Sequence, residues 1–359
     1  MVAQITVHQS PRDLLVALRD VPGADSRETA TAIGYLYGLA TATTAAAAPA
    51  GEEEDGRPDA KTQLIVSVWD DGNLRLLFTK LDWSQCKIVS PVAPDQLAKL
   101  ALPFIPMLRE RLLTLAPLDA NPELLRGITG PEVLVDALLD GWPHPRIAEP
   151  SMYILPASCA VPPPAPVFPA EHTMSRIRDF SQLPHGEVDA ITELVRGFWG
   201  DHVTAPKLDR AGRIAYVANM ATTEALWVYR APPKIEQAPS ITVPVGFVYT
   251  GRPTSHTCAI RGVYVDPAYR SSGIATRMVS HVVHAHLATA TRRTIDWKRP
   301  LDEQDLVDDE TKWGRKDEVC LFVEPENKGA RQAYERVGFK ISETLWCDVD
   351  LEGVEKGHW

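Results

Sequence analysis

The chain has 359 residues, of which 45% are hydrophobic, an ordinary proportion for a folded globular protein. Acidic residues outnumber basic ones by 47 to 37, so the formal net charge is −10. This balance argues against nucleic acid as the main partner, because phosphate backbones select basic surfaces. No apolar run is long enough to span a bilayer, so we expect no membrane partner. The length favours two domains over one.

The N-terminus lacks the charged and apolar regions of a signal peptide. The five cysteines are odd in number and widely spread, and no pair has metal-ligand spacing. We therefore expect a cytoplasmic protein with reduced thiols and no metal.

Residues 1–156 mix helical and strand patterns and predict a smaller α/β domain. The pattern predicts helices at 27–47, 95–115 (broken by Pro103 and Pro106) and 131–139, and strands at 64–68, 74–78 and 152–155. The turn signal at 70–73 joins the first two strands as a hairpin. Residues 157–172 follow as a linker, because the proline run at 162–166 is stiff and extended.

Residues 173–359 predict a second α/β domain with the order β-α-α-β-β-β-α-β-α-β. The predicted strands lie near 174–180, 226–229, 243–249, 258–265, 319–323 and 345–349, and the helices near 188–199, 209–221, 274–291 and 327–337. A charged insertion at 294–317 separates the third helix from the next strand, and we expect a solvated flap there.

A loop in the middle of this domain has the pattern of an anion site. The strand at 263–265 stops at Asp266-Pro267, and the loop at 270–275 then opens a helix. This order directs backbone N–H groups and the positive end of a helix dipole toward one point, where a phosphate binds well. Gly273 permits a close approach because it has no Cβ.

A second pattern lies downstream, on the helix at 327–337. Asn327, Ala330, Tyr334 and Val337 are spaced by three or four residues and share one helix face. Asn-x-x-Ala-x-x-x-Tyr-x-x-x-Gly-Phe arises by chance in about one chain in ten thousand at average composition.

The two patterns, in this order, resemble the acyl-CoA-binding core of the GNAT superfamily of N-acetyltransferases. The resemblance covers roughly residues 173–351 and is strongest at 265–275 and 326–339. It implies an α/β (α+β) fold, with a GNAT-like mixed sheet and an acetyl-CoA-binding β-loop-α crossover. It also implies acetyl-CoA as co-substrate.

The resemblance assigns the donor-binding residues. Backbone groups of Val263, Tyr264 and Val265 would bind the pantetheine amides, and Asn327 would bond the same arm from the helix face that Ala330 shares. The pyrophosphate would lie on the N–H groups of the loop, with the Thr276 hydroxyl nearby. The loop residues are Arg270, Ser271, Ser272, Gly273, Ile274 and Ala275. We also expect the side chains of Arg261, Arg270 and Arg277 to form a positively charged group beside this loop, which we call the basic mouth.

Catalysis by acyl transfer needs a proton donor for the departing thiolate and a neutral amine. The resemblance places Tyr334 near the thioester sulfur, and a phenol with a pKa near 10 stays protonated at neutral pH. The alternative is a tyrosine that only packs its helix on the sheet. Many relatives carry a glutamate on the strand before the loop, where this chain has Ala259 or Arg261. Glu324 is therefore the candidate base, and removal of the proton through water is the equal alternative.

Two other sets of residues invite chemical interpretations that we do not favour. Cys258 and Cys320 lie in predicted strands, where buried cysteines are common, so direct transfer without a covalent enzyme intermediate is expected. His281, His284 and His286 lie on the helix after the loop, and we expect a packed or solvated face there because no third metal ligand has suitable spacing.

The sequence therefore predicts an acetyl-CoA-dependent N-acetyltransferase that acts on a primary amine of a small molecule or amino acid, as a monomer or homodimer. One alternative is protein or peptide N-acetylation, with the insertion docking the partner. Another is an acyl-CoA-binding module without catalysis. For residues 1–156 we predict a degenerate GNAT-like half that binds no CoA and helps to wall the acceptor pocket. The alternative there is an unrelated α/β domain that only stabilises the chain.

Overall fold

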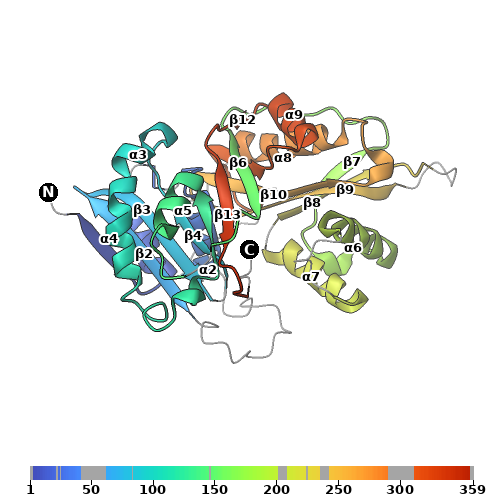
Figure 1. Ribbon diagram of the computed structural model, residues 1–359. Coiled ribbons are helices and arrows are strands. Elements are labelled where there is room, and N and C mark those ends of the chain that lie inside the picture. The colour runs from blue at the N-terminus through green and yellow to red at the C-terminus, as the bar shows by residue number, and fades with distance from the viewer. Residues whose placement is uncertain are drawn as a thin grey trace.

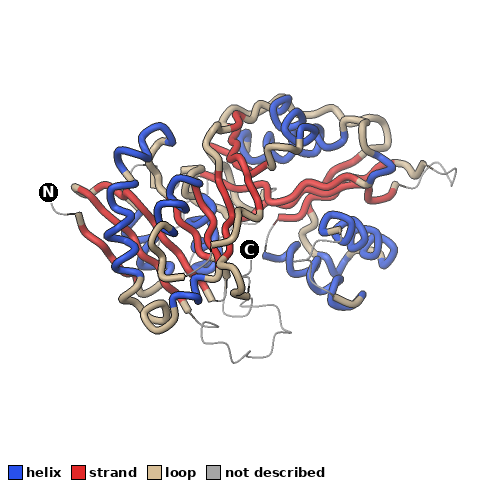
Figure 2. Tube along the Cα trace, in the orientation of Figure 1, coloured by secondary structure: helices blue, strands red, loops and turns tan. Residues whose placement is uncertain are grey.

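A computed structural model describes residues 3–21, 23–24, 26–41, 62–82, 84–144, 147–200, 208–223, 225–234, 242–289 and 311–355. Within this part of the chain, strands from both halves join into one continuous mixed sheet with helices on both faces (Figures 1 and 2). The α/β class expected from the sequence is confirmed. No helix among the described residues is both long and apolar enough to cross a membrane.

The first half contains strands and helices in an α/β alternation. Its strands are β1 (Gln4–His8), β2 (Gln63–Asp70), β3 (Asn73–Leu81), β4 (Cys86–Val89), β5 (Gly127–Pro131) and β6 (Met152–Cys159). Its helices are α1 (Pro11–Leu18), α2 (Ala30–Thr41), α3 (Leu97–Leu100), α4 (Ile105–Leu112) and α5 (Glu132–Leu139). The predicted hairpin is confirmed, with Asp71 and Gly72 at φ 52° and 74° as its two turn residues require. The predicted break near Pro103 also occurs, between α3 and α4.

The second half follows the predicted order, with one short strand, β12, that the sequence did not predict. Its strands are β7 (Thr173–Arg176), β8 (Ala225–Ala231), β9 (Val243–Gly251), β10 (Thr257–Val265), β11 (Glu318–Val323), β12 (Lys340–Ile341) and β13 (Trp346–Asp350). Its helices are α6 (His185–Trp199), α7 (Arg210–Thr223), α8 (Ile274–Ala288) and α9 (Lys328–Val337). Most of the insertion at 294–317 lies outside the described residues, which resume at Thr311.

The two halves repeat one arrangement. In each half, the first four strands pair in sequence order and antiparallel, and the fourth strand pairs in parallel with the fifth. Two helices follow the first strand in both halves, and one helix separates the fifth strand from the last long one. The first half therefore has the strand order of the second apart from the short β12, with the short helices α3 and α4 where the second half has α8.

The last strands of the two halves are exchanged. The centre of the sheet runs β5-β13-β6-β11, so β13 lies between two strands of the first half, and β6 pairs with β11 of the second. Figure 1 shows β6 in green beside β13 in red at the junction. The domain boundary expected after residue 156 falls inside a strand, because β6 continues to Cys159 to complete this pairing.

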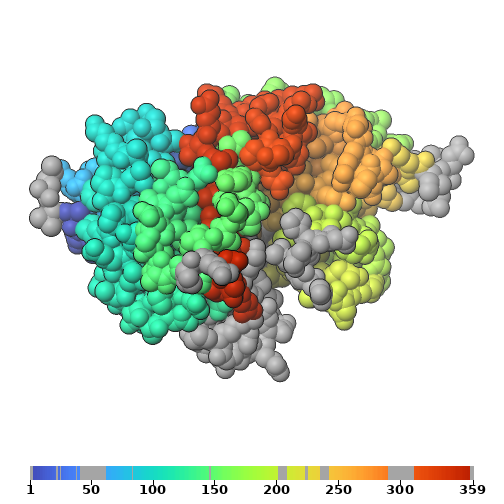
Figure 3. All heavy atoms as spheres, viewed as in Figure 1, coloured from blue at the N-terminus to red at the C-terminus, as the bar shows by residue number. Residues whose placement is uncertain are grey.

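Helices cover both faces of the sheet around separate apolar clusters. In the first half, α4 and α5 pack on one face, and α1 and α2 on the other. In the second half, α8 and α9 share one face, and α6 and α7 the opposite face. Ala30 of α2 packs with Ala259 and Cys320 of the second half, so α2 belongs to the contact between the halves. The space-filling view shows the halves as one body, with the red C-terminal residues over their boundary (Figure 3).

Candidate active site

The strands β10 and β11 diverge toward their carboxyl ends. They pair in parallel only over Thr257–Ile260 and Glu318–Leu321, although β10 continues to Val265 and β11 to Val323. On its other edge β10 carries a bulge at Arg261, where its register with β9 shifts. Bulges bend a strand and often re-aim it next to a functional site. The result is a gap that opens just after Ile260.

Backbone groups of β10 line this gap. The N–H of Asp266 donates to the Val245 carbonyl, 2.9 Å away on the β9 side. The N–H and C=O groups of successive residues point to opposite edges of a strand. Those of Tyr264 therefore also face β9, whereas those of Val263 and Val265 face the gap. Arg270 Nε donates to the Val265 carbonyl at 3.0 Å, in agreement with that direction. The sequence predicts all three as backbone ligands; the structure leaves Tyr264 out because its backbone is paired within the sheet.

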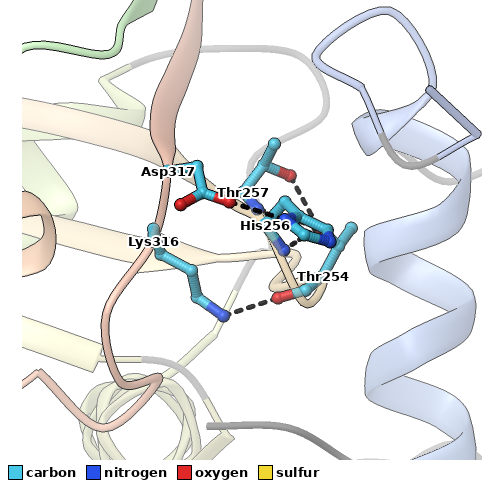
Figure 4. A network of polar contacts seen from close by, with 5 residues as sticks. All are labelled: Thr254, His256, Thr257, Lys316 and Asp317. Atoms are coloured by element: carbon cyan, nitrogen blue, oxygen red, sulfur yellow. Dashed lines mark hydrogen bonds and ion pairs between the residues drawn. The ribbon is translucent and has the colours of Figure 1, made fainter. Parts of the chain in front are cut away.

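A polar network holds the other end of the two strands together (Figure 4). His256 Nδ1 lies 2.6 Å from Asp317 Oδ2, and the Asp317 N–H donates to the His256 carbonyl at 2.8 Å. Lys316 Nζ donates to the carbonyl of Thr254 at 2.5 Å, and the Thr254 and Thr257 hydroxyls are 2.9 Å apart. Because these contacts fix the amino ends, the gap widens only toward the carboxyl ends, where the loop lies.

The loop after β10 has the geometry of an anion site. Asp266 accepts a bond from the Ala268 N–H at 2.7 Å and closes a short turn at Pro267–Tyr269. Gly273, at φ 76°, begins the 15-residue α8, and no side chain caps that N-terminus. The first N–H groups of a helix have no partner inside it, and the helix dipole adds positive potential at the same point. Since Ser271, Ser272 and Gly273 are exposed, a pyrophosphate fits there without displacing a side-chain cap.

Basic side chains lie beside this loop, but not the predicted set. Arg277 Nη1 donates to the Ser272 carbonyl at 2.8 Å, and Arg270 folds back onto β10. Arg261 is not part of the mouth: its guanidinium lies 5.7 Å from the ring centroid of Tyr249, which belongs to the cluster under α6 and α7. The bulge turns it to that face. Lys234, which sequence reasoning missed, bonds the Ala268 carbonyl through Nζ and the Tyr269 hydroxyl through its backbone N–H.

The start of α9 places Asn327 and Glu324 beside the gap. Asn327 Oδ1 accepts a bond from the Ala330 N–H at 3.1 Å and so caps the helix. Its amide N–H groups bond no described residue and stay available as donors. Glu324 is exposed directly after β11, and its carbonyl accepts the Asn327 N–H at 3.1 Å.

Tyr334 lies on α9, with its ring 5.8 Å from that of Phe339. Its hydroxyl bonds no side chain or backbone group in the described residues. Burial raises the pKa of Tyr334 to about 12, so the phenol keeps its proton at any physiological pH. The ring packs against the core, and the hydroxyl is a protonated donor without a partner in the protein.

The cysteines and histidines that invite chemical interpretations are structural. Burial raises the pKa of Cys258 to about 12 and that of Cys320 further, so neither is a thiolate near neutral pH. The His281 ring packs edge-on against Trp227, and His284 Nδ1 lies 2.9 Å from the Pro163 carbonyl. His286 is fully buried. In the described ranges, no group of three metal-ligating side chains comes together.

The corresponding place in the first half is different. There β4 and β5 pair in parallel only at Cys86–Lys87, and the following turn at 90–96 contains prolines at 91 and 94, which have no N–H. The helix that follows, α3, has only four residues. Only a shallow depression with room for about one water remains there, lined by Ser90, Val92, Pro94, Leu97, Pro131, Trp346 and neighbouring side chains.

Comparisons with known proteins agree with this architecture. Residues 224–341 match the family model of the acetyltransferase (GNAT) domain. No curated protein matches the chain at a significant level. The structure of a Drosophila protein shares 10% identity over 98% of this chain and 99% of that chain, with a TM-score of 0.54. At this identity the likeness supports the fold alone.

Two further solved structures are similar over nearly the whole length. A GCN5-related N-acetyltransferase from Sphaerobacter thermophilus has 16% identity over 98% of this chain and 97% of that chain, with a TM-score of 0.43. A tandem GNAT protein from the clavulanic acid biosynthesis pathway has 12% identity over 97% and 98%, with a TM-score of 0.40.

Proposed function

The chain belongs to the GNAT acetyltransferases through its residues 224–341, and we propose from this premise that it transfers an acetyl group from acetyl-CoA to a primary amine of a small molecule or amino acid. The transfer is direct, within a ternary complex. The observation that carries the proposal is the gap between β10 and β11, which opens beside the uncapped N-terminus of α8.

The residues around the gap fit acetyl-CoA, which when bound supplies the acetyl group as a thioester. Val263 and Val265 offer backbone groups to the pantetheine amides. The Val265 carbonyl can accept from both the arm and Arg270, because a carbonyl oxygen has two lone pairs. The N–H groups of residues 271–275 bind the pyrophosphate with the Thr276 hydroxyl, whereas the Arg270 N–H already donates to the Pro267 carbonyl at 3.4 Å. The Asn327 amide donates to the arm from the other side.

Two residues serve the proton transfers. Tyr334 donates its proton to the departing sulfur, a task that its raised pKa permits at neutral pH. The attacking amine must be neutral, and Glu324 at the carboxyl end of β11, directly or through water, takes the proton that it loses.

The first half takes part as a degenerate repeat that binds no CoA. Its turn has no N–H at Pro91 and Pro94 and leads into a four-residue helix, so it lacks the helix N-terminus that a pyrophosphate needs. Its α2 packs against β10, on the face opposite α8 and α9, so it walls the side from which the amine approaches.

Turnover and stoichiometry test these statements. The protein is incubated with acetyl-CoA and a panel of amines, amino acids and lysine-bearing peptides, and free thiol is followed. We expect amine-dependent thiol release, with one acetyl-CoA bound per chain in calorimetric titration. Binding without amine-dependent release would leave a non-catalytic module, preference for peptides would favour protein acetylation, and two molecules per chain would contradict the degenerate first half.

A further inference from the structure

Aromatic side chains gather on the face of β10 that is opposite α8 and α9, beside the point where the gap begins. We call them the aromatic wall and define it as Phe198 and Trp199 of α6, Tyr216 of α7, Tyr249 of β9 and Tyr264 of β10. These residues belong to the apolar cluster between the sheet and the helices α6 and α7, or pack against it. Figure 1 shows α6 and α7 below the sheet, with α8 and α9 above it.

The rings of the aromatic wall form one continuous set. The ring centroid of Phe198 lies 5.5 Å from that of Trp199, 6.2 Å from that of Tyr249 and 6.4 Å from that of Tyr264, and each pair meets edge to face. Trp199 extends the set to Tyr216 at 6.4 Å. Edge-to-face contacts in this range are favourable beyond the burial of area, so the rings hold one another in place.

Glycines bring the aromatic wall against β10. A Cβ at Gly262 would lie 2.1 Å from Cε1 of Tyr249 and 3.1 Å from Cζ of Phe198, so both rings cover the strand at that residue. A Cβ at Gly197 on α6 would lie 2.4 Å from the hydroxyl oxygen of Tyr264, so the end of α6 approaches the end of β10. Glycine is needed at both positions because a side chain would displace a ring.

The aromatic wall lies next to the proposed reaction centre. Ile260 is the last residue of β10 that pairs with β11, and the bulge at Arg261 follows it directly. Ala259 packs against Ala30 of α2, whereas its two neighbours in the strand belong to the cluster under α8. Side chains alternate along a strand, so α2 lies on the face that carries the wall. Along β10, the gap therefore begins between α2 and the rings of the wall.

Most of the aromatic wall keeps part of its surface in solvent. Tyr249 is buried, whereas Phe198, Trp199, Tyr216 and Tyr264 are only partly buried. Removal of apolar surface from water is favourable, and binding sites for small molecules are lined mainly by apolar and aromatic side chains. Partly exposed rings beside a reaction centre therefore favour a ligand that covers them.

We propose that the acetyl acceptor is a primary amine joined to an aromatic ring by a short carbon chain, and that the aromatic wall binds this ring. Phe198, Trp199 and Tyr264 supply ring faces and edges, which an aromatic ligand contacts more favourably than an aliphatic one. The amine of the acceptor then lies over the start of the gap, where Gly262 has no side chain. The inference rests on the proposed function, because it names the acceptor of that reaction.

The chemical step is that of the proposed function. The C–N bond of the amide forms as the C–S bond of the thioester breaks. The amine loses a proton to Glu324, directly or through water, and the sulfur gains one from Tyr334. The aromatic wall takes part only by holding the ring of the acceptor.

The first experiment compares amines that differ only in the group attached to a two-carbon chain. Thiol release from acetyl-CoA is measured with phenethylamine, 2-cyclohexylethylamine and ethylamine. We expect kcat/KM for phenethylamine to exceed that for ethylamine about 30-fold, because burial of one phenyl ring contributes a factor of about 10 to 100. It should exceed that for the cyclohexyl analogue about threefold, since contacts between rings add to burial. Phenethylamine that is no better than either analogue would overturn the proposal and leave acetyl transfer standing.

Variants assign the preference to the aromatic wall. Phe198→Leu and Trp199→Leu keep an apolar side chain without the ring, and each should lower the ratio of kcat/KM for phenethylamine to that for ethylamine about fivefold. Trp199→Phe retains a ring and should retain most of the preference. Phe104→Leu is the matched control, because Phe104 is a partly buried phenylalanine of the first half, and its ratio should equal that of the wild type.

The Kd for acetyl-CoA is measured on every variant and reports whether the donor half is still folded. Among variants that bind acetyl-CoA as the wild type does, a wild-type ratio in Phe198→Leu and Trp199→Leu would contradict the proposal. An equal loss in Trp199→Phe and Trp199→Leu would show that side-chain volume, not the aromatic ring, is responsible.

Direct binding separates failure of the aromatic wall from failure of the proposed function. Phenethylamine and ethylamine are titrated calorimetrically into the wild type and Phe198→Leu, each with excess CoA. If no amine is turned over, the proposed function fails, and phenethylamine binding that is weakened in Phe198→Leu still supports the aromatic site. Equal binding of phenethylamine to the wild type and Phe198→Leu, or no binding to either, overturns the site.

Discussion

The turn after β4 and the loop after β10 occupy the same place in two repeats of one fold, yet they differ in the groups that we propose to bind phosphate. The loop after β10 exposes N–H groups and opens a 15-residue helix through a left-handed glycine. The turn after β4 has prolines at 91 and 94 and leads into a helix of four residues. The contrast continues in the next helix, because α5 has no tyrosine where α9 carries Tyr334.

This difference shows that strand order and parallel pairing alone do not make a donor site. Both halves keep the parallel pair that begins to diverge, but only the second adds the long helix with an uncapped N-terminus and the tyrosine that we propose as proton donor. Function here resides in a few residues placed on a shared scaffold.

Cutting the chain between the repeats should have the largest effect. Residues 167–359 alone lack β6, which pairs with β11, and their β13 loses both neighbours, β5 and β6. We expect this fragment to be unfolded or aggregated in circular dichroism and gel filtration. Co-expression with residues 1–166 restores every strand and should give a folded complex. A cooperative melt of the fragment alone would contradict the importance of the exchanged strands.

Gly273→Glu should abolish donor binding at the loop. The side chain must adopt φ 76°, and its carboxylate would face the pyrophosphate, so we expect the Kd for acetyl-CoA to rise about 10³-fold, roughly 4 kcal/mol. Gly72→Glu is the matched control, since Gly72 has φ 74°, open space around it and a place in the first half. Calorimetric titration checks both variants. Similar affinity for the two would remove the pyrophosphate from this loop.

Tyr334→Phe should lower kcat about 10²-fold with little change in the KM for acetyl-CoA, because the lost hydroxyl acts in the transition state. Since burial raises the pKa of Tyr334 to about 12, its ionisation should not limit the wild-type rate below about pH 11. Tyr153→Phe, at a half-exposed site on β6, serves as control. A wild-type kcat for Tyr334→Phe would leave Tyr334 as a core residue only.

Lys87→Met should stabilise the protein in a pH-dependent way. The folded-state pKa of Lys87, about 7, lies below its ordinary value of 10.5. Below pH 7 the buried ammonium must be charged, and this lowers the free energy of unfolding. The destabilisation by Lys87 decreases as the pH rises from 7 to 10.5. We expect the variant to gain on the order of 2 kcal/mol at pH 6 and much less at pH 10, measured by urea unfolding. A gain that does not depend on pH would show that packing, not charge, is responsible.

The sequence predicted the second half well because its motif residues are local. The loop at 270–275 and the face of α9 were found from spacing alone, and the structure places them on either side of the same gap. Lys234 and the true position of Arg261 were not predictable in this way. The first reaches the loop from a distant turn, and a bulge redirects the second.

The first half was harder to read because its strands depend on partners. Gly127–Pro131 has the composition of a loop, yet it forms β5 between β4 and β13. A Cβ at Gly130 would lie 2.2 Å from the Ile88 carbonyl, so glycine permits close pairing there. The exchange of β6 and β13 cannot be predicted from the local sequence, because a hydrophobic pattern indicates a strand but not the strand with which it pairs.

The exchange of the last strands also means that the first half cannot complete its sheet until the C-terminal strand has been synthesised. A ribosome releases the chain from the N-terminus, and domains commonly fold as they emerge. Here β5 waits for residues 346–350 before it gains its second neighbour, which is more than 200 residues of translation later. Meanwhile β5 and β6 present open edges to other chains, a recognised risk for aggregation. We therefore expect the nascent first half to depend on chaperones until the last strand leaves the ribosome.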